Sequence, residues 1–292
     1  MQYSYKAKHI IVISTIFCLG LFLISACAKS DSHFANDVAN ISAQFLDTPY
    51  HLDPLGEGNV SDTNIGQGIH KDSDPLYRTD VFDCLTYVET VLAHAKVQKL
   101  FSTTNTHPTT KDFINAMNKI RYQNGTVSFV NRTHFQYPDW VNNNSDILSI
   151  ATDDIAYSTG ITPATSTINL CRGNWFKQTH NIDIKDDSCE QVSLNYLPLS
   201  KILNHTSQLS EIIAKPYIFM TVISDDTLPQ KIGTEYNISH TGFILPHNDG
   251  KLYLRHASKI RGKVTDSNMV SYIKSLQKNK KYLGFALLKI NI

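Results

Sequence analysis

Cys84 directly follows Asp83 at the start of an amphipathic segment, and its position is that of an activated nucleophile. Unpaired backbone N–H groups and the helix dipole stabilise a thiolate at a helix start, where a cysteine pKa falls from about 8.5 toward about 4 to 7. Two later histidines, in Ser239-His240-Thr241-Gly242 and Leu254-Arg255-His256-Ala257, offer a base and a group that orients it. These residue types point to nucleophilic acyl transfer.

The spacing of His240 and His256 suits a β-hairpin. The stretch from Pro246 to Gly250 reads as a five-residue turn, and a hairpin that closes Leu245 against Lys251 places His240 directly opposite His256. Opposite side chains on one face have Cβ atoms about 5 Å apart, so the two rings could hydrogen-bond. A slip of one residue would put them on opposite faces and remove the argument.

The five cysteines differ in their surroundings. Cys18 lies within an apolar N-terminal stretch and Cys27 follows that stretch. A polar segment separates Cys171 from Cys189, and an oxidising compartment favours a disulfide between them. Cys84 then remains as a free thiol, which indicates reactivity, although a small buried hydrophobic residue is the alternative interpretation.

The first residues read as a secretory signal. Basic residues precede an apolar stretch from Ile10 to Ile24 that is shorter than the roughly 20 residues of a membrane-spanning helix. Leu23-Ile24-Ser25-Ala26-Cys27 resembles the bacterial lipobox, whose cysteine is acylated. We therefore expect a signal peptide over residues 1–26, lipidation of Cys27, a tether over residues 27–38 and one catalytic domain over residues 39–292. Ala28 resembles the sorting signal for an outer membrane, which predicts a periplasmic lipoprotein of the bacterial cell envelope.

Composition excludes two classes of protein. Of 292 residues, 41% are hydrophobic and 18% are charged, which is typical of a globular chain and excludes overall disorder. The 27 basic and 26 acidic residues nearly cancel, so the chain lacks the broad basic surface of a nucleic-acid-binding protein.

Hydrophobic periodicity predicts helices early in the chain and strands late. Residues 121–210 show no pattern from which helices or strands could be assigned in detail. Residues 51–79 are predicted to form a long polar loop, and loops of this kind often contain functional residues. The order favours an α+β fold over a wound parallel sheet. The predicted helices are Asp37–Leu46, Leu85–Leu100 with Asp83 as N-cap, and Lys111–Ile120, and the predicted strands are Tyr217–Ile223, Ile238–Leu245, Lys251–Ser258 and Tyr282–Ile290.

Four further motifs accompany the two histidine strands. They are Phe45-Leu46-Asp47-Thr48-Pro49-Tyr50, Phe82-Asp83-Cys84-Leu85-Thr86-Tyr87-Val88-Glu89, Ile120-Arg121-Tyr122-Gln123-Asn124-Gly125 and Arg132-Thr133-His134-Phe135. Together they resemble the DUF1460 group of N-acetylmuramoyl-L-alanine amidases, within the NlpC/P60 superfamily of papain-like cysteine hydrolases. The resemblance implies helices packed on an antiparallel sheet with family-specific insertions. Asp47 stands where the family pattern usually has glycine, and Leu85 where threonine is common.

The resemblance also implies a reaction, cleavage of the amide between N-acetylmuramic acid and L-alanine in peptidoglycan fragments. Cys84 would attack the carbonyl, His240 would transfer the proton and His256 would fix the tautomer of His240. The Cys84 backbone N–H and the Tyr50 hydroxyl would meet the oxyanion. By family position, Arg132 and His134 are candidate substrate-binding residues, with a structural ion pair as the alternative for Arg132.

Other functions stay open at this point. An NlpC/P60 endopeptidase would cut within the stem peptide, and an inactive relative would be a cell-wall-binding lipoprotein. A zinc amidase is the weakest alternative, because no His-Glu-X-X-His motif occurs. We expect no metal or cofactor.

Overall fold

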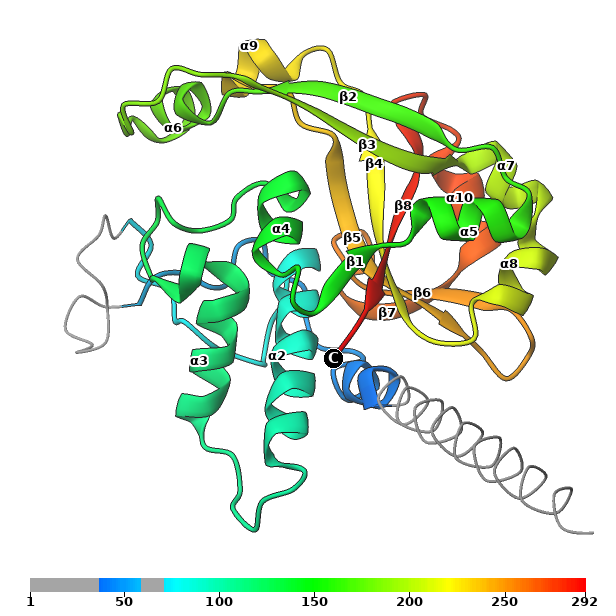
Figure 1. Cartoon of the computed structure of the whole chain (residues 1–292), viewed down its shortest axis with the longest axis horizontal. Coiled ribbons are helices and arrows are strands. Elements are labelled where there is room, and N and C mark those ends of the chain that lie inside the picture. The colour runs from blue at the N-terminus through cyan, green and yellow to red at the C-terminus, as the bar shows by residue number, and fades with distance from the viewer. Residues whose placement is uncertain (1–36, 59–70) are drawn as a thin grey trace, which may run out of the picture.

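The core of the protein is one antiparallel sheet with the strand order β2-β3-β8-β4-β5-β6-β7, and β1 pairs with β8 beside this path (Figure 1). The structure is a computed structural model that describes residues 37–58 and 71–292. The strands are Leu148–Ile150 (β1), Ala164–Leu170 (β2), Glu190–Pro198 (β3), Tyr217–Ile223 (β4), Ile238–Pro246 (β5), Leu252–Ser258 (β6), Lys263–Asn268 (β7) and Tyr282–Ile290 (β8).

Helices cover both faces of this sheet, as Figure 1 shows. α2 packs on one face and α3 lies against α2, whereas α5, α7, α8 and α10 cover the other face. Residues 37–44 form a further helix. The longer helices are Cys84–Phe101 (α2), Thr110–Arg121 (α3), Thr152–Thr159 (α5), Arg172–His180 (α6), Thr206–Ile212 (α8) and Met269–Leu276 (α10), and the short ones are Val141–Asn143 (α4), Leu199–Asn204 (α7) and Leu228–Ile232 (α9).

The central strand β4 shows why the sheet needs cover on both sides. Ile218 and Met220 belong to the core beneath α2, while Phe219 belongs to the core beneath α10. Successive side chains of a strand point to opposite faces, so a strand buried on both faces reads as a continuous apolar run.

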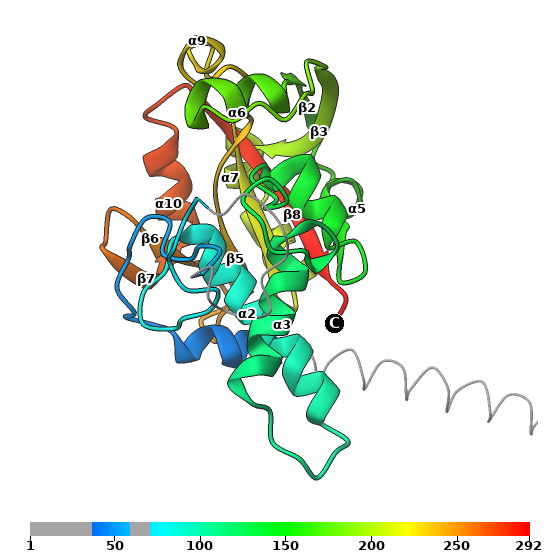
Figure 2. The same cartoon turned by 90° about the vertical axis from the view of Figure 1, so that its left-hand side faces the viewer.

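Within residues 121–210, which sequence periodicity left unassigned, β2, α6 and β3 form an arm, whereas α5, α7 and α8 pack on the sheet. β3 pairs with β8 only at Leu197↔Phe285 and Pro198↔Gly284, so most of the β2–β3 hairpin extends past the sheet and carries α6 (Figures 1 and 2). A Cβ atom on Gly284 would lie 2.1 Å from the Leu197 carbonyl oxygen, so this junction requires glycine.

The predicted disulfide is confirmed, with 2.05 Å between the sulfurs of Cys171 and Cys189. Cys171 is the residue before α6, and Cys189 directly precedes β3. The bridge therefore joins the two strands of the arm at the end away from the sheet, where α6 begins.

The α+β class, with helices packed on an antiparallel sheet, is confirmed. The strands predicted at Tyr217–Ile223 and Tyr282–Ile290 have the observed bounds, and the other predicted strands and helices differ by a few residues at most. The predicted signal peptide and lipidation site lie outside the described residues. Within the described residues, no helix combines the length and apolar character needed to cross a membrane.

Candidate active site

Asp83 sets the start of α2 and so places Cys84 in its first turn. Its carboxylate accepts a hydrogen bond from the Thr86 backbone N–H at 2.8 Å, and the Thr86 hydroxyl oxygen accepts one from the Asp83 N–H at 3.0 Å. This reciprocal capping box confirms Asp83 as the N-cap. Among the cysteines that the structure describes, Cys84 alone is free.

The protonation state of Cys84 differs from the prediction. Cys84 keeps part of its surface exposed, but the protein packed around its thiol raises the pKa to about 12, and the Asp83 carboxylate adds to the rise. Backbone hydrogen bonds from Thr241, Leu85 and Cys84 itself lower the pKa by less. The prediction of a thiolate at the helix start is wrong for this state, because desolvation outweighs the helix terminus.

The two histidines meet as predicted, but in a different register. The Nε2 atom of His240 on β5 lies 2.7 Å from Nδ1 of His256 on β6, and the ring planes make an angle of 82°. β5 continues to Pro246, which pairs with Leu252, so Leu245 faces Tyr253 and not Lys251. The five-residue turn begins one residue later than predicted and the register shifts by two. An even shift keeps both histidines on one face, where they meet diagonally.

Gly242 permits this approach of β5 to the second histidine. A Cβ atom at position 242 would lie 2.7 Å from the His256 Cβ and 2.6 Å from the Arg255 carbonyl oxygen. Any larger residue would push the two strands apart. The glycine of the His-Thr-Gly sequence is therefore a packing requirement of the imidazole pair.

Both imidazoles are neutral near pH 7. Burial lowers the pKa of His240 to about 3, and the neighbouring His256 contributes in the same direction. Burial likewise lowers the pKa of His256 to about 4, against the opposing effect of Asp266. A neutral imidazole beside a neutral thiol can accept the thiol proton as the sulfur attacks.

Tyr50 also belongs to this site. Burial raises the pKa of its hydroxyl to about 12, and the next contributions come from Cys84 and Asp83. A single parallel bridge between Tyr50 and Phe82 ties the tyrosine to the segment just before the helix. The preceding turn contains Asp47 with φ of +67°, the left-handed conformation that glycine adopts most readily. That conformation explains why glycine is common at this position in the family pattern.

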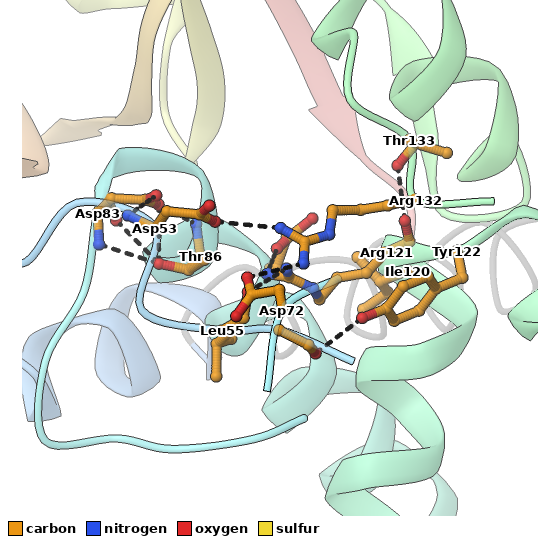
Figure 3. A network of polar contacts seen from close by, with 12 residues as sticks. Asp53, Leu55, Asp72, Asp83, Thr86, Ile120, Arg121, Tyr122, Arg132 and Thr133 are labelled. Atoms are coloured by element: carbon orange, nitrogen blue, oxygen red, sulfur yellow. Dashed lines mark hydrogen bonds and ion pairs between the residues drawn. The ribbon is translucent and has the colours of Figure 1, made fainter. Parts of the chain in front are cut away.

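Arg132 lies at the centre of a charged network beside the same helix start (Figure 3). Its Nε atom donates to Glu57 at 3.0 Å, and its terminal nitrogens donate to Asp53 and Asp72, each at 3.1 Å. The arginine side chain is 9% exposed and the Glu57 side chain is fully buried. The guanidinium thus holds together the segments on either side of residues 59–70, as the ion-pair alternative predicts.

A cavity of about 240 Å³ adjoins Cys84 through Asp83, Leu85 and Thr86. Arg132 and His134 both border it, as do the aromatic residues Phe129, Trp175 and His180. Burial lowers the pKa of His134 to about 3, and its Nε2 atom lies 2.7 Å from the Phe129 carbonyl oxygen.

Sequence reasoning missed Asp53 and the two α6 residues Trp175 and His180. The α6 residues lie between the cysteines of the disulfide, and that position was the one available signal. Asp53 lies in the polar loop over residues 51–79 that the sequence marked as a functional region, but its partners Asp83 and Arg132 are distant in sequence, so no pattern singled out this residue.

Comparison with known proteins identifies the family of the chain. The model of the AmiA-like family, described as N-acetylmuramoyl-L-alanine amidase-like, matches residues 40–280. A crystal structure of a DUF1460 protein from Legionella pneumophila str. Philadelphia 1 is 25% identical, with a TM-score of 0.73 and 89% of each chain covered. No curated protein matches the sequence.

A crystal structure of an N-acetylmuramoyl-L-alanine amidase from Bacteroides uniformis is also similar. It is 22% identical with a TM-score of 0.61, and the match covers 89% of this chain and 100% of that chain. At this identity the likeness shows the fold. Because the family model spans most of the sequence, the chain belongs to the AmiA-like, N-acetylmuramoyl-L-alanine amidase-like family.

Proposed function

We propose that this protein is a papain-like cysteine amidase of the NlpC/P60 type that cleaves the amide between N-acetylmuramic acid and L-alanine in peptidoglycan fragments. The observation that carries the proposal is the 2.7 Å contact between His240 and His256, together with the backbone N–H of the adjacent Thr241 that donates to the free Cys84 thiol. The family supports a peptidoglycan-related substrate.

Catalysis starts from neutral groups. His240 accepts the Cys84 proton while the sulfur attacks the substrate carbonyl, and the resulting imidazolium then gives the proton to the leaving nitrogen. The Cys84 N–H and the Tyr50 hydroxyl donate to the oxyanion. Water then releases the acid from the thioester, with His240 again taking and returning a proton.

In this proposal the cavity beside Asp83 binds the sugar part of the substrate during the reaction. Its aromatic side, formed by Phe129, His134 and Trp175, suits the apolar face of a sugar ring. Its polar side has charged groups that can hydrogen-bond hydroxyl and acetamido groups. In this proposal His134 contacts the substrate from the aromatic side, and Arg132, held in place by its ion pairs, contacts it from the polar side.

A second candidate function is supported by the charge of the network. Five carboxyl groups surround the guanidinium groups of Arg121 and Arg132, so the region carries an excess of negative charge. Such a wall favours an amino group, as in an endopeptidase acting on stem peptides with a free N-terminus. The carboxyl groups are those of Asp53, Glu57, Asp72, Asp83 and Glu89.

Mass analysis of the products distinguishes the two reactions. We expect the full chain to convert a defined muropeptide into sugar and a peptide that begins with free L-alanine, and Cys84→Ala to form neither product. Cleavage inside the stem peptide with the sugar linkage intact would replace the amidase proposal with the endopeptidase. Hydrolysis by Cys84→Ala at the original rate would reject the cysteine mechanism.

The envelope location is part of the proposal. A lipid on Cys27 would anchor the catalytic domain, residues 39–292, at the periplasmic side of the outer membrane, because several acyl chains hold a protein there almost irreversibly. Metabolic labelling with a palmitate analogue tests this. The label should enter the wild-type chain and be lost in Cys27→Ser, and label retained in Cys27→Ser would contradict it.

A further inference from the structure

The histidine pair continues into a third residue. The Nε2 atom of His256 lies 3.2 Å from the Oγ of Ser267 on β7. In the β6–β7 register His256 faces Thr265, so Ser267 lies two residues further on the same face. Ser267, His256 and His240 thus form a hydrogen-bonded row, and the residue after His240, Thr241, donates its backbone N–H to the Cys84 sulfur.

The direction of the hydrogen bonds along this row decides whether His240 can act as a base. A neutral imidazole has one N–H and one bare nitrogen, and Nε2 of His240 and Nδ1 of His256 share one hydrogen. If His240 donates, its own Nδ1 is bare and can accept the thiol proton. His256 must then carry its hydrogen on Nε2, where the Ser267 oxygen accepts it. In the reverse arrangement Ser267 donates and His240 carries its hydrogen on Nδ1, where it cannot accept a proton.

The other groups around His256 cannot take over this role. The Asp266 carboxylate is held by Arg255, whose Nε and a terminal nitrogen donate to it at 2.7 and 2.8 Å. Tyr272 of α10 presents its ring, with centroids 5.2 Å apart, and Phe219 contacts His256 from β4. Burial keeps both imidazoles neutral, so the tautomer and not the charge is what the surroundings must select.

We propose that Ser267 is a positioning residue, which accepts a hydrogen bond from Nε2–H of His256 and thereby holds His240 in the tautomer that can deprotonate Cys84. The proposal rests on the cysteine amidase function. The serine needs no contact with the substrate.

The test combines kinetics with nitrogen NMR of the full chain carrying ¹⁵N-histidine. In the wild type we expect His256 to be protonated at Nε2 and His240 at Nε2. We expect Ser267→Ala to lower kcat about tenfold and to leave KM unchanged, because a tenfold loss is the size expected for one lost hydrogen bond. In the NMR spectrum of this variant, His256 should show a mixture of its two tautomers. Ser267→Thr, which keeps the hydroxyl, should restore both.

Ser271→Ala is the matched control, because Ser271 borders a cavity of about 500 Å³ together with His256 and Ser267, but its side chain bonds only Asn268. A wild-type His256 protonated at Nδ1 would overturn the proposal, as would Ser267→Ala with unchanged kcat and unchanged histidine spectra. If the wild-type chain hydrolyses no muropeptide while its tautomers respond to Ser267→Ala, the amidase function fails and the role of Ser267 stands. If Ser267→Ala does not fold, the wild-type and Ser267→Thr spectra still decide the tautomer.

Discussion

Two regions with opposite electrostatic character meet at the start of α2, one made of neutral groups and the other of charged groups. On one side, Cys84, His240 and His256 are uncharged, because burial shifts each pKa toward the neutral form. On the other side, the Arg132 guanidinium is charged and forms ion pairs with three carboxylates, so this region keeps an excess of negative charge. The contrast shows that the reactive groups are kept neutral by desolvation, while the adjoining loop is held in shape by paired charges.

Asp83 joins the two regions. One carboxylate oxygen caps α2 through Thr86, and the other accepts a hydrogen bond from the Asp53 backbone N–H at 3.2 Å. Asp53 in turn pairs with Arg132. The carboxylate next to Cys84 therefore belongs to the charged network, and it raises the pKa of the Cys84 thiol.

Removal of the base on the neutral side should have the largest effect. We expect His240→Gln to lower kcat by at least about 1,000-fold, since the proposed mechanism uses His240 as the base that takes the Cys84 proton. His247→Gln, at an exposed turn of the same hairpin, should leave the rate unchanged. Initial rates with a defined muropeptide measure both, and a loss under tenfold in His240→Gln would show that the neutral pair is not the catalytic base.

Removal of one partner from the most buried ion pair should chiefly affect stability. The side chains of Glu89 and Arg121 are 3% and 5% exposed, and their charged atoms lie 2.9 Å apart. We expect Glu89→Ala to lower the free energy of unfolding by about 3 to 5 kcal/mol, because it leaves a buried guanidinium without its partner.

The exposed pair between Lys96 and Asp146 provides the control for this prediction. Asp146→Ala should cost at most about 1 kcal/mol in urea unfolding. Equal losses in Asp146→Ala and Glu89→Ala would contradict the view that burial makes the network of Arg121 and Arg132 a structural support.

Tyr50→Phe tests whether the Tyr50 hydroxyl, which adjoins the neutral groups, donates a hydrogen bond to the oxyanion. Removal of one oxyanion donor typically raises the barrier by about 2.7 to 4 kcal/mol, so kcat should fall roughly 100- to 1,000-fold while the fold persists. Tyr157→Phe, at a tyrosine that is 91% exposed, serves as the control. An unchanged kcat in Tyr50→Phe would show that backbone N–H groups alone stabilise the oxyanion.

The smallest predicted effect is a pH dependence of stability from His256. Its pKa is about 4 in the folded protein and about 6.5 when unfolded, so below pH 6.5 the unfolded chain binds a proton that the folded chain does not. Stability is therefore lost as the pH falls from 6.5 toward 4, by about 2 kcal/mol between pH 7 and 5 for this one group.

Urea unfolding of wild type and His256→Asn at pH 7, 6 and 5 measures this contribution. The stability of the variant should fall less steeply with decreasing pH. His107→Asn, in an exposed loop, should retain the wild-type slope. Parallel curves for wild type and His256→Asn would show that His256 is not held neutral by burial.

Local features of the site could be predicted because neighbouring residues produce them. The capping box needs only Asp83 and Thr86, three residues apart, and the face shared by His240 and His256 survives any even shift in register. The pKa of Cys84 could not be predicted this way, since its direction depends on how much protein surrounds the sulfur. The partners of Arg132 were equally hidden, because Glu57 and Asp72 lie 75 and 60 positions away.

The sequence by itself determined the helix that begins at Cys84, the strands that carry the two histidines and the disulfide between Cys171 and Cys189. Each follows from hydrophobic periodicity, from helix capping, or from the number and surroundings of the cysteines. These are properties of nearby residues or of residue type. Only the tertiary structure decided which groups are charged, which carboxylates hold Arg132 and that Ser267 completes the row behind His256. These depend on desolvation and on contacts between distant segments, and both arise only when the sheet and its two layers of helices pack together.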